Sequence, residues 1–251
     1  MVDWQDPAVI ATEADALLKL TNVLVGIYYW EFLISLDFEW SFIRGQRKFK
    51  WPMIFYFLNR YCLLVSFTMI LIPVFFRPTN CHAIYHFLEI IGNMCAAFSS
   101  LILALRTMAI WVDNLYIKGC IILLILGQWV ILLQGDNIQA DWVRGTGCVF
   151  TATGNQILAA FFIYTMCLDF SILLLTAWKL VRPAFWRFSP MAQLLFQDGL
   201  VYFILVFFSN FIVAVFEILN LNTVMNIMFN APSVLVATVC VSVRSPELLF
   251  H

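Results

Sequence analysis

The feature that most constrains this chain is a series of long apolar segments separated by short polar ones. Seven segments recur, at about 16–37, 52–75, 84–111, 117–134, 152–178, 194–219 and 223–243. Each is long enough for the ~17 to 25 residues that a membrane-spanning helix needs. Helix is the expected form, because backbone groups in lipid must be hydrogen-bonded within the spanning segment itself.

The composition agrees with a membrane location. Hydrophobic residues make up 63% of the chain and charged residues 12%, against about 25% charged in an ordinary soluble domain. We therefore predict one multi-pass membrane domain over residues 1–251, of the all-α class, built as a bundle of seven transmembrane helices. The net charge of -1, without a basic stripe interleaved with aromatic residues, gives no support to a nucleic-acid partner.

Lys and Arg are unequally divided between the two predicted sides. With the N-terminus outside, all of them except Lys19, Arg77 and Arg144 fall on the cytoplasmic side. Basic residues next to spanning helices are retained in the cytoplasm. We predict an outside N-terminus and a cytoplasmic C-terminus, with the lipid bilayer as partner, in the plasma membrane or a membrane of the secretory pathway.

Two of the seven cysteines differ in position from the others. Cys81 and Cys148 lie on the predicted outer side, just before the third and fifth segments, whereas the other five lie within apolar segments. The outer compartment favours disulfides, so these two are a candidate pair. Their spacing leaves the pairing open, because a disulfide needs a specific Cα geometry.

The same cysteines bear on a resemblance to G-protein-coupled receptors, which commonly join the top of the third helix to the second outer loop. Arg106 lies near the cytoplasmic end of the third segment, where such receptors often place a switching arginine. The chain departs from their pattern, because Leu105 replaces the preceding acidic residue and Asn230-Ala231-Pro232 replaces an Asn-Pro pair. The resemblance is therefore one of architecture.

A second resemblance covers most of the chain. The stretch YYWEFLISLDFEWSFIRGQRKFKWPMIFYFLNRY, together with LALRTMAIW at 103–111 and QDGLVYF at 197–203, resembles a fungal family of uncharacterised seven-helix membrane proteins. Where that family usually has Asp in the first helix, this chain has Glu31. The resemblance implies a fungal source and a multi-pass membrane location, and it implies no activity.

Polar residues within the spans are the candidate binding residues. An ionisable group at the bilayer centre costs about 2.5 to 3.5 kcal/mol on insertion scales, so each one calls for a partner or a purpose. The candidate ligand cavity, between the third and fifth segments, is lined by Glu89, Asn93, Asn155, Gln156 and Asp169. The more frequent role of such groups is to make interhelical hydrogen bonds that fix the packing, and that alternative stays open.

A second set of charged residues gathers toward the cytoplasmic side. The candidates for a switch or for packing are Glu31, Asp37, Glu39, Arg60, Arg106 and Asp198. Charge networks of this kind lock helix ends together, and they also serve bistable switches. We expect structural partners for Arg60 and Arg106.

The sequence gives no catalytic site, no cofactor site and no complete metal site. His82, His86 and Glu89 share one helix face with a spacing that suits zinc, but the only other histidine is His251, which leaves too few ligands. No lysine lies deep in a segment, which excludes a retinal Schiff base. Phosphate-binding glycine loops and nucleophile elbows are also missing, so we predict that the chain is not an enzyme.

These observations favour a receptor-like membrane protein that senses a small or lipidic ligand from its outer half and acts on a cytoplasmic effector. The main alternative is a membrane transporter or channel, which needs a continuous polar path through the bundle. A metal-dependent membrane enzyme using His82, His86 and Glu89 is the third reading. Water access from one side, access from both sides, and a bound metal would distinguish the three.

Overall fold

The computed structural model describes residues 4, 6–45, 51–75, 81–112, 114–134, 139–143, 147–152, 155–181, 190–219 and 221–248. Nine helices and one two-stranded hairpin make up most of this described part. In chain order they are α1 (Pro7–Ile34), α2 (Leu36–Ile43), α3 (Met53–Phe75), α4 (Cys81–Ile110), α5 (Leu115–Leu133), β1 (Gln139–Val143), β2 (Gly147–Ala152), α6 (Asn155–Val181), α7 (Pro190–Leu219), α8 (Thr223–Met228) and α9 (Asn230–Leu248).

Helices lie at all seven of the predicted apolar segments. One segment corresponds to α1 with α2, one to α8 with α9, and each of the other five to a single helix. Within the described residues, α3, α4, α5 and α6 are long and apolar enough to cross a membrane, and α7 and α9 contain shorter apolar stretches. The prediction of a helical chain with several membrane-compatible helices is confirmed at this level.

Side-chain caps explain where α1 and α8 begin. The apolar pattern places the start of the first helix later and does not distinguish α8 from α9. The Asp6 carboxylate accepts a hydrogen bond from the Ala8 N–H at 3.0 Å, with Pro7 at the first helical position, as helix N-termini prefer. The first helix therefore begins well before residue 16. Asn222 caps α8 in the same way, accepting from the Met225 N–H at 2.8 Å.

The junction of α1 and α2 lies within the first predicted segment. Ser35 separates the two helices, and its hydroxyl donates to the Glu31 carbonyl at 2.8 Å and to the Glu31 carboxylate at 3.0 Å. Serine hydroxyls that bond a carbonyl one turn back often bend helices. This break contains no proline or glycine, so the residue composition does not predict it.

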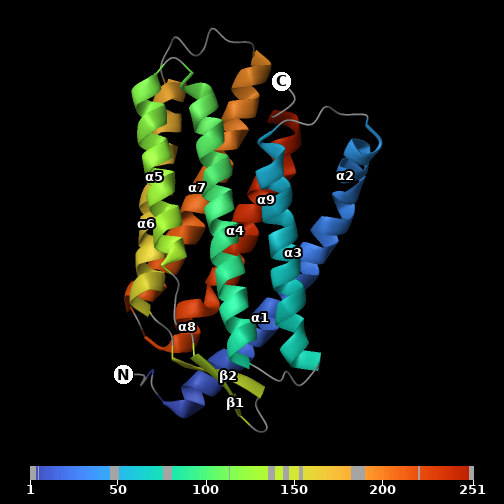
Figure 1. The fold of residues 1–251 in the computed structure, drawn as a ribbon, viewed down its shortest axis with the longest axis vertical. Coiled ribbons are helices and arrows are strands. Elements are labelled where there is room, and N and C mark those ends of the chain that lie inside the picture. The colour runs from blue at the N-terminus through green and yellow to red at the C-terminus, as the bar shows by residue number, and fades with distance from the viewer. Residues whose placement is uncertain are drawn as a thin grey trace.

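The long helices pack side by side with alternating direction (Figure 1). α4 lies at the centre of the bundle, in contact with α3, α5, α6 and α9, and is the most enclosed of the four membrane-compatible helices, whereas α5 is the most exposed. The outer face of α5 presents Leu115, Leu123, Leu126 and Leu133. A face of this composition suits the hydrocarbon of a bilayer.

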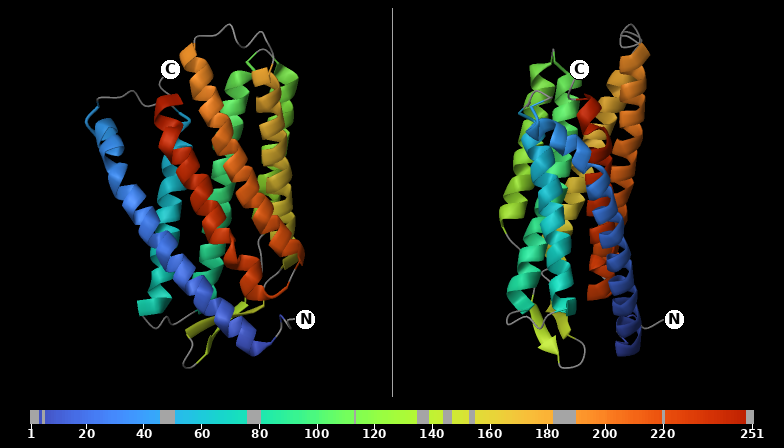
Figure 2. Two further views of the ribbon diagram at one scale, coloured as in Figure 1. Left: turned by 180° about the vertical axis from the view of Figure 1, so that it is seen from behind. Right: turned by 90° about the vertical axis from the view of Figure 1, so that its right-hand side faces the viewer.

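One end of the bundle carries a small β-hairpin that the all-α prediction does not include. β1 and β2 pair antiparallel, from Gln139 opposite Ala152 to Val143 opposite Gly147. The hairpin packs against α3 and α4, and it lies at the same end as the start of α1 and as α8, whereas α9 ends at the opposite end (Figures 1 and 2). The helix of the fifth segment begins at Asn155, close to the predicted start at about 152, and residue 152 itself ends β2.

Candidate functional site

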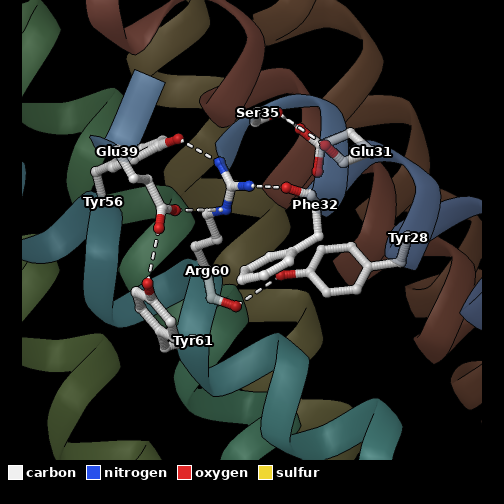
Figure 3. A network of polar contacts seen from close by, with 8 residues as sticks. All are labelled: Tyr28, Glu31, Phe32, Ser35, Glu39, Tyr56, Arg60 and Tyr61. Atoms are coloured by element: carbon white, nitrogen blue, oxygen red, sulfur yellow. Dashed lines mark hydrogen bonds and ion pairs between the residues drawn. The ribbon is translucent and has the colours of Figure 1, made fainter. Parts of the chain in front are cut away.

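A buried arginine on α3 joins α3 to α1 and α2. Arg60 is 0% exposed, and its guanidinium has three polar partners. Nε lies 3.0 Å from Glu39 Oε1 on α2, Nη1 donates to the Tyr56 hydroxyl at 2.8 Å, and Nη2 donates to the Phe32 carbonyl at 2.7 Å (Figure 3). The group also lies 4.6 Å from the centre of the Phe32 ring, in cation–π range.

The partners of Arg60 are themselves held in place. The other Glu39 oxygen accepts from the Tyr61 hydroxyl at 2.7 Å, and the Tyr28 hydroxyl donates to the Arg60 carbonyl at 2.6 Å. We call the set Tyr28, Phe32, Glu39, Tyr56, Arg60 and Tyr61 the Arg60 junction. Phe32 lies in the last turn of α1, where carbonyl groups lack partners within the helix, so the helix break supplies an acceptor for the arginine.

The four other predicted switch residues differ from one another in where they lie. Glu31 borders the Arg60 junction (Figure 3), with one carboxylate oxygen bound by Ser35 and the other buried. Asp37 is exposed on α2, and Arg106 is half-buried on α4. The side chain of Asp198 lies outside the described residues. The structure thus brings Glu31, Glu39 and Arg60 together, and the structural partner expected for Arg60 is confirmed.

A second polar cluster runs through the middle of the bundle. The Asp169 carboxylate on α6 is 2% exposed. Its two oxygens accept from the Ser100 hydroxyl of α4 at 2.9 Å and from the Asn210 amide of α7 at 2.6 Å. The Asn210 amide oxygen in turn accepts from the Ser233 hydroxyl of α9 at 2.8 Å. Four helices therefore meet around one carboxylate.

The cluster continues to α3 and closes on itself. The Asn59 amide lies 3.2 Å from the Ser99 hydroxyl of α4 and 3.3 Å from the Thr238 hydroxyl of α9. Ser99 is next to Ser100, and Ser233 and Thr238 share α9, so the hydrogen bonds and helix backbones encircle the bundle core. We call this set the Asp169 belt: Asn59, Ser99, Ser100, Asp169, Asn210, Ser233 and Thr238, all buried.

The residues predicted to line an outer cavity do not all lie at one depth. Glu89 and Asn93 are half-buried in the half of α4 nearer the hairpin. Asp169 contacts Ser100, which lies about 16 Å beyond Glu89 along a helix rising about 1.5 Å per residue. The side chains of Asn155 and Gln156 lie outside the described residues. Asp169 makes the interhelical hydrogen bonds that were the alternative to ligand binding.

The candidate metal ligands and the candidate disulfide sit near the same end of the bundle. The rings of His82 and His86 are stacked, with centroids 6.0 Å apart. Among the described residues, no group of three or more His, Cys, Asp or Glu side chains is arranged to hold a metal ion. The side chains of Cys81 and Cys148 lie outside the described residues, so their pairing stays a prediction.

Most members of the two clusters were not singled out from the sequence. The missed residues are Tyr28, Phe32, Tyr56, Tyr61, Asn59, Ser99, Ser100, Asn210, Ser233 and Thr238. Asn59 and Asn210 carry a usable signal, because an amide within an apolar span calls for a partner. The serine and threonine residues carry none, since each hydroxyl can bond a carbonyl of its own helix.

Comparisons of the chain with family models, with curated proteins and with solved structures found no match.

Proposed function

We propose that the chain is a seven-span membrane protein with its N-terminus outside and its C-terminus in the cytoplasm, and that it works as a receptor-like sensor of a small or lipidic ligand. An effector would bind at its cytoplasmic end. The proposal keeps the expected place in the plasma membrane or the secretory pathway, and the expected kinship with the fungal seven-helix family.

The arrangement of helix ends and charges supports the orientation. α1 begins at one end of the bundle and α9 finishes at the other (Figure 2), which suits an odd number of crossings. Arg44, Lys118 and Lys179 lie near the end of α2, the start of α5 and the end of α6, all at the end where α9 finishes. Lys19 lies toward the opposite end, and this distribution of basic residues supports a cytoplasmic location for the former end.

One observation carries the sensing proposal. Asn59 of the Asp169 belt and Arg60 of the Arg60 junction are neighbours on α3. A ligand that displaces α6 or α7 in the outer half would disturb the belt, and α3 would pass the disturbance to Glu39 and α2. Coupling of this kind needs an element with two arrangements, and the Ser35 break between α1 and α2 supplies a candidate.

Transport makes a different demand on the same bundle. A transporter needs a path that opens to each side in turn, whereas a sensor needs water access to its ligand site from one side. The buried side chains of the Asp169 belt separate the outer half of α4, with Asn93, from its cytoplasmic half, with Thr107. A sensor and a transporter therefore differ in the side of the membrane from which water reaches each half of α4.

Cysteine accessibility tests both the topology and the function. In a variant without native cysteines, single substitutions Asn93→Cys and Thr107→Cys are exposed to an impermeant thiol reagent in intact cells and in inside-out vesicles. Lys19→Cys and Arg44→Cys serve as matched controls. Both positions are exposed, Lys19 on α1 and Arg44 directly after α2. We expect Lys19→Cys to react only from outside and Arg44→Cys only from inside.

For a sensor, Asn93→Cys reacts from outside only, and Thr107→Cys does not react from outside. Reaction of either position from both sides would favour a transporter or channel and contradict the sensing proposal. Reaction of Lys19→Cys from inside only would reverse the orientation. Each outcome is read against the two control positions in the same preparation.

The pair Cys81 and Cys148 gives an independent check of the outer face. With the other five cysteines replaced by Ala or Ser, we expect labelling in intact cells only after reduction. Labelling without reduction would remove the predicted disulfide, and labelling only after permeabilisation would contradict the outer location.

A further inference from the structure

Asp169 is a buried acid whose hydrogen-bonding partners are neutral. Its carboxylate accepts hydrogen bonds from the Ser100 hydroxyl and the Asn210 amide, and neither partner carries a charge. Glu39, the buried acid of the Arg60 junction, instead faces a guanidinium at 3.0 Å. An ionised carboxylate in an apolar interior is expensive unless it is paired with a charge, so Asp169 needs another way to lose its charge.

The helices packed around Asp169 do carry ionisable groups, at other levels. Arg106 of α4 comes six residues after Ser100, about 9 Å further along the helix axis. Other ionisable groups on α6 and on the helices packed against it include Cys167 on α6 itself, Cys95 on α4, Lys118 and Cys120 on α5, and Glu217 on α7. The hydrogen bonds of the Asp169 carboxylate come from Ser100 and Asn210 and from none of these groups.

We propose that Asp169 is a proton-binding site at the centre of the bundle, and that the Asp169 belt is built to hold the protonated acid. The inference deepens the proposed function, since it depends on α6 lying in the bilayer. In the neutral form Oδ1–H donates to the Ser100 hydroxyl oxygen, while Oδ2 continues to accept from Asn210. When the proton leaves to water, the Ser100 hydroxyl again donates to Oδ1, and the belt holds an unpaired negative charge.

The belt can accommodate this reversal without moving a backbone. Once Ser100 accepts from the acid, its own proton needs an acceptor, and a carbonyl one turn back on the helix is available to serine and threonine. Two hydroxyls further along the same helices bond in this way: Thr107 of α4 donates to the Leu103 carbonyl at 3.1 Å and Thr176 of α6 to the Ile172 carbonyl at 2.8 Å. A hydroxyl rotation therefore suffices to adapt α4 to either form of the acid.

Proton release should weaken the contacts among α4, α6 and α7. A folded state that binds the proton more tightly than the unfolded chain is most stable at low pH and loses that stability as the pH rises through its titration. Asp169→Asn mimics the neutral acid, because its amide can donate to Ser100 and its carbonyl can accept from Asn210. The variant should fold without this part of the pH dependence.

The test uses the full chain in lipid nanodiscs. Thermal unfolding midpoints are measured from ~pH 5 to ~pH 9, a range above the ordinary titration of aspartate, for the wild type, Asp169→Asn and the exposed control Asp15→Asn. The infrared carbonyl band of a protonated carboxylic acid is recorded on the same samples. We expect the wild-type midpoint to fall with rising pH relative to Asp169→Asn, Asp15→Asn to follow the wild type, and a protonated-acid band that Asp169→Asn lacks.

Equal pH profiles for the wild type and Asp169→Asn would overturn the proposal. So would the absence of the acid band from the wild type at every pH, which decides the matter even if Asp169→Asn fails to fold. A wild-type midpoint that rises with sodium relative to choline, and no longer does so in Asp169→Asn, would assign the site to a metal cation instead. Accessibility labelling judges the sensing function separately, so the two failures are distinguishable.

Discussion

The Arg60 junction and the Asp169 belt bury acids in two different ways. In the junction, Glu39 and Arg60 neutralise each other, and each also has a hydrogen bond with a tyrosine hydroxyl. In the belt, one acid accepts hydrogen bonds from a hydroxyl of α4 and an amide of α7, which belong to a set of neutral groups that extends to α9 and α3. The junction fixes the position of α2 through charge, whereas the belt ties helices through neutral contacts and leaves one group free to change its protonation.

Arg60→Met should have the largest effect on stability, because it leaves Glu39 buried without its counter-charge. We expect a loss of about 3–5 kcal/mol in the free energy of unfolding, the usual cost of breaking a buried pair. Denaturant titration in mixed micelles would measure it. Arg44→Met is the matched control: Arg44 is exposed and lies over Trp40, and its loss should cost less than about 1 kcal/mol.

The double variant Arg60→Met with Glu39→Gln sharpens this result. Gln removes the orphaned charge and keeps an acceptor for the Tyr61 hydroxyl, so most of the lost stability should return. A loss for Arg60→Met no larger than that for Arg44→Met would show that the ion pair does not hold α2 in place.

Asn210→Ala should cost less, about 1–3 kcal/mol, because it leaves Asp169 and Ser233 each short of one hydrogen bond. Asn93→Ala, at a half-buried position on α4, is the control, and its effect should be smaller. The same unfolding titration applies. A loss as large as that for Arg60→Met would mean that the belt holds a charge like the junction, and the contrast between the two regions would disappear.

Gly127→Ala probes a contact that depends on close packing alone. A Cβ at Gly127 would clash with the Tyr164 hydroxyl, which donates to the Leu124 carbonyl at 2.9 Å. We expect a loss of about 1–3 kcal/mol, as for other overpacked sites, and partial recovery when Tyr164→Phe is added. Gly119→Ala on the same helix, where a Cβ meets no atom within 4 Å, should not destabilise the protein.

Tyr61→Phe should have the smallest effect, about 0.5–1.5 kcal/mol. It removes one hydrogen bond to Glu39 and leaves the pair with Arg60 intact. Tyr29→Phe, which removes an exposed contact with Thr68, is the matched control and should cost less. If Tyr61→Phe proves as damaging as Arg60→Met, hydrogen bonding rather than charge pairing dominates the junction.

The helices were predictable from the sequence because long apolar segments have few alternatives to helix in a bilayer. The hairpin was not predictable, because its two strands within residues 139–152 are short. The segment also lacks a sustained alternation of polar and apolar residues. The break at Ser35 also gave no signal, since it depends on one hydroxyl turning back to Glu31.

The two clusters were predictable only in part. Arg60, Glu39 and Asp169 stood out because charges are rare within apolar spans. Their partners did not, because a serine or tyrosine in a helix is common and the contacts join residues far apart along the chain. Asn59 and Thr238, for example, are separated by 179 residues, a pairing that no local pattern reveals.

The contacts of α1 bear on the order in which the protein is assembled during synthesis. α1 packs against α8 and α9, and Asn222 reaches the Glu13 carboxylate at 2.6 Å, across 209 residues. Chains emerge N-terminus first and build early contacts from what has already been made. α1 can therefore meet α3 early, through the Arg60 junction, whereas its contacts with α8 and α9 form only after those two helices have been translated.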